Sequence, residues 1–268
     1  MNEVASSFYP ILRKPWNRKQ TDRIRQAWKA VQWRETTRKR DEFICLSNLL
    51  DVDFDPSWED HEISTKFIDS LGESIPAGFI FIAGKKLEKI GYRWAPASWM
   101  TGLEIDFPDP LFLPSKPVSL LASGGLVVQY PGIKLHFFES SKHERFWVPM
   151  SRDLSLWYHV ENADGEMTDI QSQSNSDSSA IILCRPNPGK QREIALLVNI
   201  MTDEQFERDA GLNTKTESDF HIATPNRRVW VNLEEDLQVI QRLRAAFLER
   251  QIICWGEELS VSQKWCVI

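Results

Sequence analysis

The segment GYRWAPASWM, residues 91 to 100, gathers side chains that could recognise another molecule. It places four candidate binding residues around Pro96, namely Tyr92, Arg93, Trp94 and Trp99. Tyrosine, tryptophan and arginine are enriched in binding hot spots, and an aromatic ring can hold a cation over its face. A ligand or partner surface built on these residues is therefore one interpretation.

The same segment can also be a corner of the fold. In a strand from Lys89 to Ala95, Tyr92 and Trp94 would share one face and Arg93 would lie on the other. Pro96 would end this strand, because it lacks a backbone donor, and would turn Trp99 back toward Trp94. The sequence favours this corner, with Arg93 partly buried and paired with a carboxylate or with carbonyl groups.

Catalytic motifs are absent from the sequence. It contains no G-x-S-x-G, G-x-x-x-x-G-K-[ST], G-x-G-x-x-G or H-E-x-x-H pattern. Ser123, beside Gly124 and Gly125, could be a nucleophile in a tight turn, but the sequence places no base near it. We therefore predict no catalytic residue and no cofactor.

The cysteine spacing gives no metal-binding pattern. The four cysteines lie far apart, with no C-x-x-C pair, and the five histidines are scattered: Cys45, Cys184, Cys254 and Cys266, then His61, His136, His143, His159 and His221. A zinc site would need ligands from distant segments. We predict buried free thiols in a reducing compartment, and no metal.

Charge is distributed unevenly. Residues 1 to 40 hold eleven Lys or Arg against three acidic residues, a net charge of +8, so the remaining 228 residues carry −14 of the total of −6. A basic segment of this kind can contact nucleic acid, or it can dock on an acidic body or an acidic partner. Because the whole chain is acidic and carries no nucleic-acid motif, we expect a protein partner and no nucleic acid.

Hydropathy places the chain inside the cell. No apolar run approaches the roughly 18 residues that a membrane span needs. The first residues, MNEVASSFYP, have an early acidic residue and no long apolar core, unlike a signal peptide. We expect a cytoplasmic protein without a membrane span.

Two amphipathic helices are predicted near the N-terminus. The run TDRIRQAWKAVQWRE places Ile24, Ala27, Trp28 and Val31 on one helical face. A second apolar cluster, FICLSNLL at 43 to 50, predicts another helix, joined to the first around residues 36 to 41.

Beyond Ser74 the pattern changes to short runs rich in Ile, Val, Phe, Trp and Tyr, which are typical of strands. These runs begin at IPAGFIFIAG and KIGYRWAP and end at RRVWVNL, and Gly124 and Gly125 mark a hairpin turn between two of them. The polar stretch 161–179 predicts a surface loop. Asn232 and Glu235 are spaced as a helix cap, which predicts an amphipathic helix over 233–250.

These elements predict an α+β fold with N-terminal helices, a mainly antiparallel β-sheet core from about 76 to 232, and a C-terminal amphipathic helix. We expect a helical segment over 1–75 and a β-rich domain over 76–268.

Two stretches resemble the region that follows the signature domain of fungal heterokaryon incompatibility proteins. The family has an Arg-Thr/Ser-Arg stretch, an Asp-Glu pair, a Cys-Leu-x-x-Leu-Leu segment and a Gly-Tyr-Arg-Trp-Ala-Pro box. The residues here that match are Arg34, Thr36, Thr37, Arg38, Asp41, Glu42, Cys45, Leu46, Leu49 and Leu50, then Gly91 through Pro96. The resemblance is clear over about residues 25 to 105.

This resemblance implies a non-catalytic regulatory or interaction module that acts in nonself recognition and regulated cell death. The signature domain, which carries the death-triggering activity in that family, does not match these residues, so its activity is not transferred to them. The alternative is an enzyme or accessory factor for a small molecule, for example in fungal secondary metabolism. A cavity lined by two or more ionisable groups would favour the alternative, and a continuous exposed apolar patch would favour the module.

Overall fold

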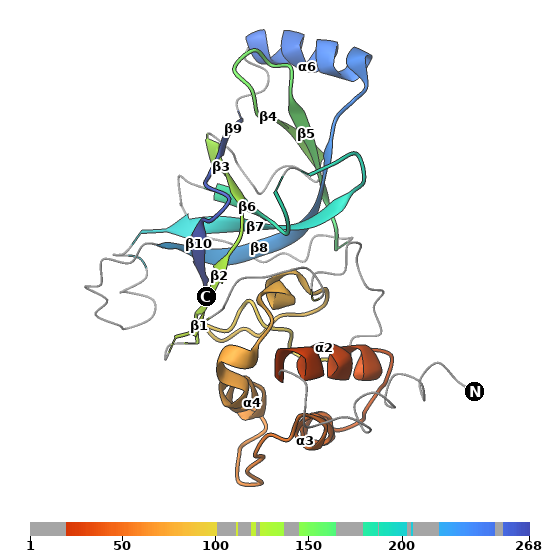
Figure 1. The fold of residues 1–268 in the computed structure, drawn as a ribbon, viewed down its shortest axis with the longest axis vertical. Helices are drawn as coiled ribbons and strands as arrows, with labels where there is room; N and C mark the ends of the chain where they lie inside the picture. The colour runs from red at the N-terminus through yellow and green to blue at the C-terminus, as the bar shows by residue number, and fades with distance from the viewer. Residues whose placement is uncertain are drawn as a thin grey trace.

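The computed structural model describes residues 20–100, 111, 119–121, 124–136, 145–164, 179–186, 188–202, 205, 220–249 and 254–268. The fold is α+β, as predicted, with three N-terminal helices on one side of a ten-stranded, mostly antiparallel sheet and one helix, α6, at the far end (Figure 1).

The first two helices, α2 (Gln20–Val31) and α3 (Lys39–Leu50), agree with the prediction. The apolar face of α2, formed by Ile24, Ala27, Trp28 and Val31, is buried. α3 ends at Asp51, whose N–H donates to the Ser47 carbonyl, and the left-handed backbone of Asp51 (φ 56°) turns the chain so that the Val52 N–H donates to the same carbonyl at 3.0 Å.

A third helix, α4 (Ile63–Leu71), was not predicted. Its buried residues Ile63, Phe67, Ile68 and Leu71 have the spacing of one helical face. The three helices bury these faces against the segment that follows them.

Residues 75 to 96 contain no strand, so the two strands predicted there are wrong. Short 3₁₀ helices, η1 (Gly72–Ser74) and η2 (Ala77–Phe81), precede a series of turns, with one isolated bridge between Lys86 and Pro96. Every residue of η2 is buried. A short, fully apolar run lacks the period that separates a strand from a helix, so composition alone misassigned it.

The sheet follows in ten strands. In chain order they are β1 (Ser119–Leu120), β2 (Leu126–Gln129), β3 (Gly132–His136), β4 (Arg145–Pro149), β5 (Trp157–Asn162), β6 (Ser179–Leu183), β7 (Glu193–Met201), β8 (Phe220–Leu233), β9 (Trp255–Glu258) and β10 (Lys264–Val267). Their order in space is β1-β2-β10-β8-β7-β6-β3-β9, with the hairpin β4–β5 attached to β8 through β5. β8 and β10 form a parallel pair, and every other pairing of the described strands is antiparallel.

The strand order closes on itself. β2 pairs with β10 and β3 pairs with β9, although these pairs lie at opposite ends of the order. Between them, Tyr130 N–H donates to Gln263 O at 3.1 Å and Leu259 N–H donates to Gly132 O at 2.8 Å. The ladder thus continues along one two-stranded ribbon, 126–136 against 255–267, which joins the two ends of the sheet.

Alternation along the central strands divides the core in two. Ile182 of β6 and Leu196 of β7 belong to the large cluster that also contains the helices, η2 and Trp99. Their neighbours Ile181 and Leu197 face the opposite cluster, under the β4–β5 hairpin. Because the helices and one face of the sheet share a single core, the described part of the N-terminal helical segment, residues 20–75, packs on the sheet directly.

The predicted turn at Gly124 and Gly125 is confirmed. It joins the antiparallel strands β1 and β2, and Gly124 adopts a positive φ of 86°. The polar segment 161–179 starts in β5 and ends in β6, and residues 165–178 lie outside the described residues.

The C-terminal helix, α6 (Leu237–Leu248), starts later than predicted. Asp236, not Asn232, is its N-cap, because the Asp236 side chain accepts from the N–H groups of Gln238 and Val239. Asn232 is still within β8. Within the described part of the chain, no helix has the length and apolar character that crossing a membrane requires.

Candidate functional site

The GYRWAPASWM segment is a corner of the core. Tyr92, Trp94 and Trp99 are buried, whereas Arg93 is exposed. The predicted strand and the predicted burial of Arg93 are both wrong, because residues 89–95 form turns around Gly91 (φ 88°) that direct Arg93 outward. The described contact of the Arg93 guanidinium is weak, from Nε to the Glu88 carbonyl at 3.5 Å.

Two of these aromatic side chains fasten the corner to its neighbours. The Trp94 indole N–H donates to the carbonyls of Gly91 (2.8 Å) and Gly124 (2.9 Å), so it bridges the corner and the β1–β2 turn. The Tyr92 hydroxyl donates to Asp69 of α4 at 2.6 Å. A Cβ at Gly124 would lie 2.3 Å from the Tyr92 ring, so this turn needs glycine for space as well as for its φ.

Trp99 is the centre of an aromatic cluster. Its ring centroid lies 5.1 Å from Phe79 of η2, 5.6 Å from Trp28 of α2 and 5.7 Å from Phe67 of α4. These distances are typical of favourable ring pairs. Trp99 therefore holds three elements together and offers no surface to a partner.

A residue outside the candidate set chosen from the sequence joins this corner to α3. Glu42 is 2% exposed, and its carboxylate accepts from the Ser98 hydroxyl at 2.9 and 3.1 Å and from the Trp99 backbone N–H. Its position four residues before Leu46 puts it on the buried face of α3. This spacing was the only sign in the sequence that Glu42 is buried. The sequence does not show its hydrogen-bond partner, because Ser98 lies far away in the chain.

The environment of Glu42 perturbs its ionisation. Burial raises the pKa of the Glu42 carboxyl above its ordinary value. The hydrogen bonds from Trp99, Ser98 and the Met100 backbone oppose this shift, as does the positive charge of Lys39. The carboxylate is thus stabilised by donors but lies in a place that disfavours its charge.

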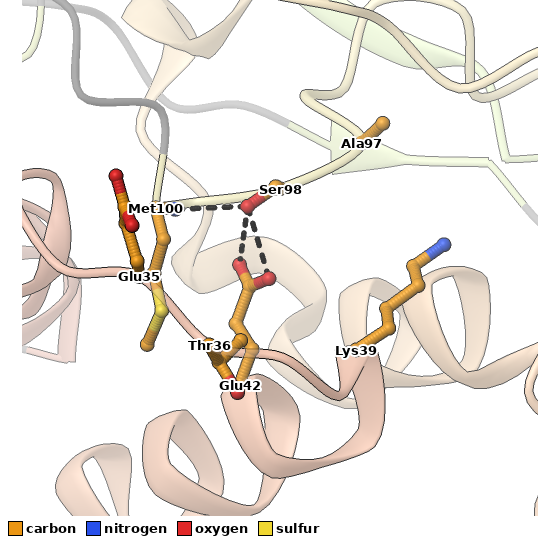
Figure 2. A pocket seen from close by; sticks show the side chains of 7 residues that line it. All are labelled: Glu35, Thr36, Lys39, Glu42, Ala97, Ser98 and Met100. Atoms are coloured by element: carbon orange, nitrogen blue, oxygen red, sulfur yellow. Dashed lines mark hydrogen bonds between the residues drawn. The ribbon is translucent and has the colours of Figure 1, made fainter.

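A pocket of about 350 Å³ opens beside Glu42 (Figure 2). Its walls come from the α2–α3 connection, the first turn of α3 and the corner, and its lining residues are Glu35, Thr36, Lys39, Glu42, Ala97, Ser98 and Met100. In Figure 2, Ser98 lies over the Glu42 carboxylate, and Glu35 and Lys39 lie to either side of Glu42. The pocket therefore combines two carboxylates, one amine, two hydroxyls and a thioether.

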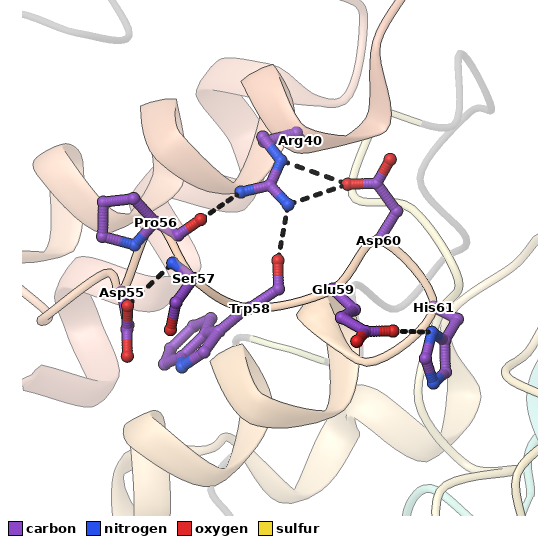
Figure 3. A network of polar contacts seen from close by, with 8 residues as sticks. All are labelled: Arg40, Asp55, Pro56, Ser57, Trp58, Glu59, Asp60 and His61. Atoms are coloured by element: carbon purple, nitrogen blue, oxygen red, sulfur yellow. Dashed lines mark hydrogen bonds and ion pairs between the residues drawn. The ribbon is translucent and has the colours of Figure 1, made fainter.

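Arg40, next to this pocket in sequence, has a structural role instead. Its guanidinium donates to Asp60 (3.1 Å) and to the carbonyls of Pro56 (2.9 Å) and Trp58 (2.5 Å), as Figure 3 shows. These bonds fasten the loop between α3 and α4. The neighbouring His61–Glu59 contact, at 3.3 Å, is exposed on the same loop.

The remaining candidates carry little chemistry. Cys184, Cys254 and Cys266 are buried free thiols, as predicted, and burial raises the pKa of each to about 12. Cys45 is half-buried. The described residues contain no cluster of three or more His, Cys, Asp or Glu side chains placed to hold a metal ion. Ser123 lies outside the described residues.

Comparison with known proteins gives no family for this chain. It matches no family model, no curated protein and no solved structure.

Proposed function

We propose that this chain is a non-catalytic regulatory module and that the pocket beside Glu42 is its recognition site. The proposal extends to a cytoplasmic role in nonself recognition and regulated cell death, for which the basis is the sequence resemblance to heterokaryon incompatibility proteins. The partner in this proposal is a protein. The pocket binds either a ligand or a side chain of the partner, and this binding switches the regulatory module between its active and inactive states.

The observation that carries the proposal is the meeting of two distant segments. Residues 34–50 and 91–96 carry the resemblance, and Glu42, from the first segment, binds Ser98 and Trp99, which directly follow the second. The pocket lies where they meet. The buried aromatic residues Tyr92, Trp94 and Trp99 then act as the support of this site rather than as its surface.

The alternative, an enzyme or accessory factor for a small molecule, is favoured by the criterion stated from the sequence, a cavity lined by two or more ionisable groups. Three ionisable side chains line the pocket, Glu35, Lys39 and Glu42, and the pKa of Glu42 is raised. A carboxyl with a shifted pKa in a cleft is a candidate acid or base. Against this role, Glu42 already binds the Ser98 hydroxyl and the Trp99 N–H, which is what a structural carboxylate does.

Filling the pocket tests the proposal. Ala97→Phe places a ring in the pocket wall, and Ala245→Phe makes the same change on an exposed position of α6. Both variants would be expressed in a filamentous fungus, with thermal melts of the purified proteins as a check on folding.

We expect Ala97→Phe to remove the proteins that co-purify with the chain and its effect on colony viability, while Ala245→Phe keeps both. If folded Ala97→Phe retains both, the pocket is not the recognition site. If it retains the protein partners but changes the level of a metabolite in cell extracts, the small-molecule alternative is correct.

A further inference from the structure

We infer that the pocket beside Glu42 binds a small zwitterion of the amino-acid type, with its cationic nitrogen at Glu42 and its carboxylate at Lys39. This inference rests on the proposed function, since it names the chemistry of the ligand at that site.

Glu42 can accept more hydrogen bonds than it receives. An ionised carboxylate offers about four acceptor positions. Ser98 has a single hydroxyl proton, which its distances of 2.9 and 3.1 Å share between the two Glu42 oxygens, and Trp99 supplies one N–H. The Met100 N–H donates to Ser98 Oγ at 3.0 Å and also acts on the Glu42 carboxylate as a third donor, which leaves about one of the four positions. Acceptor capacity therefore remains on a carboxylate that faces the pocket and has little contact with solvent.

Glu42 lacks a direct cationic partner, since Lys39 acts on it only through the attraction of its charge. Desolvation is the largest influence on Glu42, and it opposes the ionised form. No ion pair of Glu42 with a basic side chain is present among the described residues. An ammonium group in the pocket would donate a charge-assisted hydrogen bond, which is about twice as strong as a neutral one. Glu35, also in the lining, adds a second negative charge on the same side.

Lys39 supplies the opposite charge. It lies three residues before Glu42 in the first turn of α3, so both side chains emerge on the same side of the helix. Lys39 is exposed, and its amine enters none of the hydrogen bonds or ion pairs of the described residues. The positive end of the α3 dipole adds to the attraction for a carboxylate there.

The charges therefore discriminate among ligands. The lining carries two negative charges and one positive charge, so it repels a simple anion, whereas a simple amine would pair with a carboxylate and leave Lys39 without a partner. A ligand with one charge of each sign satisfies both sides. Ala97 and Met100 provide an apolar wall for a short aliphatic side chain, and about 350 Å³ suits a molecule of this size.

A matched series of probes tests the inference on the full chain. Norvaline carries both charges, butylamine is norvaline without the carboxylate, and pentanoate is norvaline without the amine. Binding of each would be followed by NMR chemical-shift titration and by isothermal calorimetry at pH 7. The protein variants are Glu42→Gln, Lys39→Gln and, as a distant control on an exposed lysine, Lys190→Gln.

We expect norvaline to bind at least tenfold more tightly than butylamine or pentanoate. Glu42→Gln and Lys39→Gln should each weaken norvaline binding at least tenfold, and Lys190→Gln should leave it unchanged. Because Lys39 is exposed, its variant remains informative even if Glu42→Gln unfolds.

Equal binding of norvaline and butylamine, or norvaline binding that Lys39→Gln leaves intact, would overturn the zwitterion assignment. So would the absence of any norvaline binding. If in that case Ala97→Phe still removes the protein partners, the ligand class is wrong but the proposed function stands. If Ala97→Phe also has no effect, both are wrong.

Discussion

The Ser98 hydroxyl donates to both oxygens of the Glu42 carboxylate, at 2.9 and 3.1 Å, although the two residues are 56 positions apart in the chain. This contact fixes the first turn of α3 against the corner that carries Trp99. The Glu42 carboxylate and the Ser98 hydroxyl therefore form part of the pocket wall and also hold Trp99 in the aromatic cluster.

Ser98→Ala should destabilise the fold by about 1–3 kcal/mol, because it removes a donor from a buried carboxylate. It also removes the acceptor of the Met100 N–H. Ser98→Thr keeps a hydroxyl and is the matched control. Urea unfolding of the three proteins measures the effect, and equal midpoints for Ser98→Ala and the wild type would show that the contact does not form.

Glu42→Gln should change how stability depends on pH. The folded chain holds the Glu42 proton more tightly than the unfolded chain, since the pKa is raised above 4.5. The stability that Glu42 contributes is then present in full below about pH 4.5 and is lost as pH rises through the folded pKa. The wild-type free energy of unfolding, relative to that of Glu42→Gln, should therefore fall as the pH rises above about 4.5.

Other carboxyls do not disturb this comparison. Hydrogen bonds from Ser151 and Ser155 lower the pKa of Asp153 to about 2, and Arg145 lowers the pKa of Glu161. These groups act in the opposite direction, but they are present in both proteins and cancel in the difference. A difference that grows with pH would mean that the Glu42 pKa is depressed instead.

Arg228 should be the most sensitive arginine of the sheet. Its buried guanidinium binds Asp164 at 2.7 Å and the Phe81 carbonyl of η2 at 3.1 Å, so it joins β8 to the helical side. Arg228→Ala should cost about 1–3 kcal/mol or more, because it leaves a buried carbonyl unsatisfied. Arg228→Lys should recover little, because lysine lacks the planar fork.

The control is Arg145→Ala, which removes an ion pair to Glu161 from an exposed position of β4. Such pairs contribute about 0–1 kcal/mol. Urea melts that rank Arg145→Ala as the more damaging change would contradict the assignment of Arg228.

The corner predicts a contrast between adjacent residues. Trp94→Ala should destabilise by about 3–5 kcal/mol, because it empties a fully buried site and leaves the Gly124 carbonyl without its donor. Arg93→Ala should stay within about 0.5 kcal/mol, as exposed substitutions usually do. A large loss of stability in Arg93→Ala would instead support the sequence-based prediction that Arg93 is partly buried and paired with a carboxylate or with carbonyl groups.

The sequence correctly predicts the elements that have a clear hydrophobic periodicity or characteristic turn residues. The face of α2 around Trp28, the strands around Leu196 and Val231 and the turn at Gly124 follow from local patterns. The two wrongly predicted strands, at residues 75–84 and 89–96, lie where the sequence has no hydrophobic periodicity that could separate a strand from other structures. η2 is apolar at every position, and the turns around Gly91 depend on a bridge from Lys86 to Pro96 rather than on a strand pattern.

The candidate site could be predicted only in part, for a related reason. Tyr92, Trp94 and Trp99 are recognisable as important from their residue types, but the sequence does not show whether they face solvent or the core. Glu42 is one of ten or more acidic residues near the helices, and only the position of Ser98 distinguishes it. Contacts between distant segments decide both questions.

The amide of Trp99 gives the most direct test of the central claim, that Glu42 holds α3 against the corner and so forms the pocket. In an NMR pH titration of the full chain, its N–H resonance should titrate with Glu42, at an apparent pKa above 4.5, and should be protected from solvent exchange. Both properties should disappear or weaken in Ser98→Ala. A Trp99 amide that exchanges like an exposed group, and whose resonance does not respond to Glu42, would contradict the account.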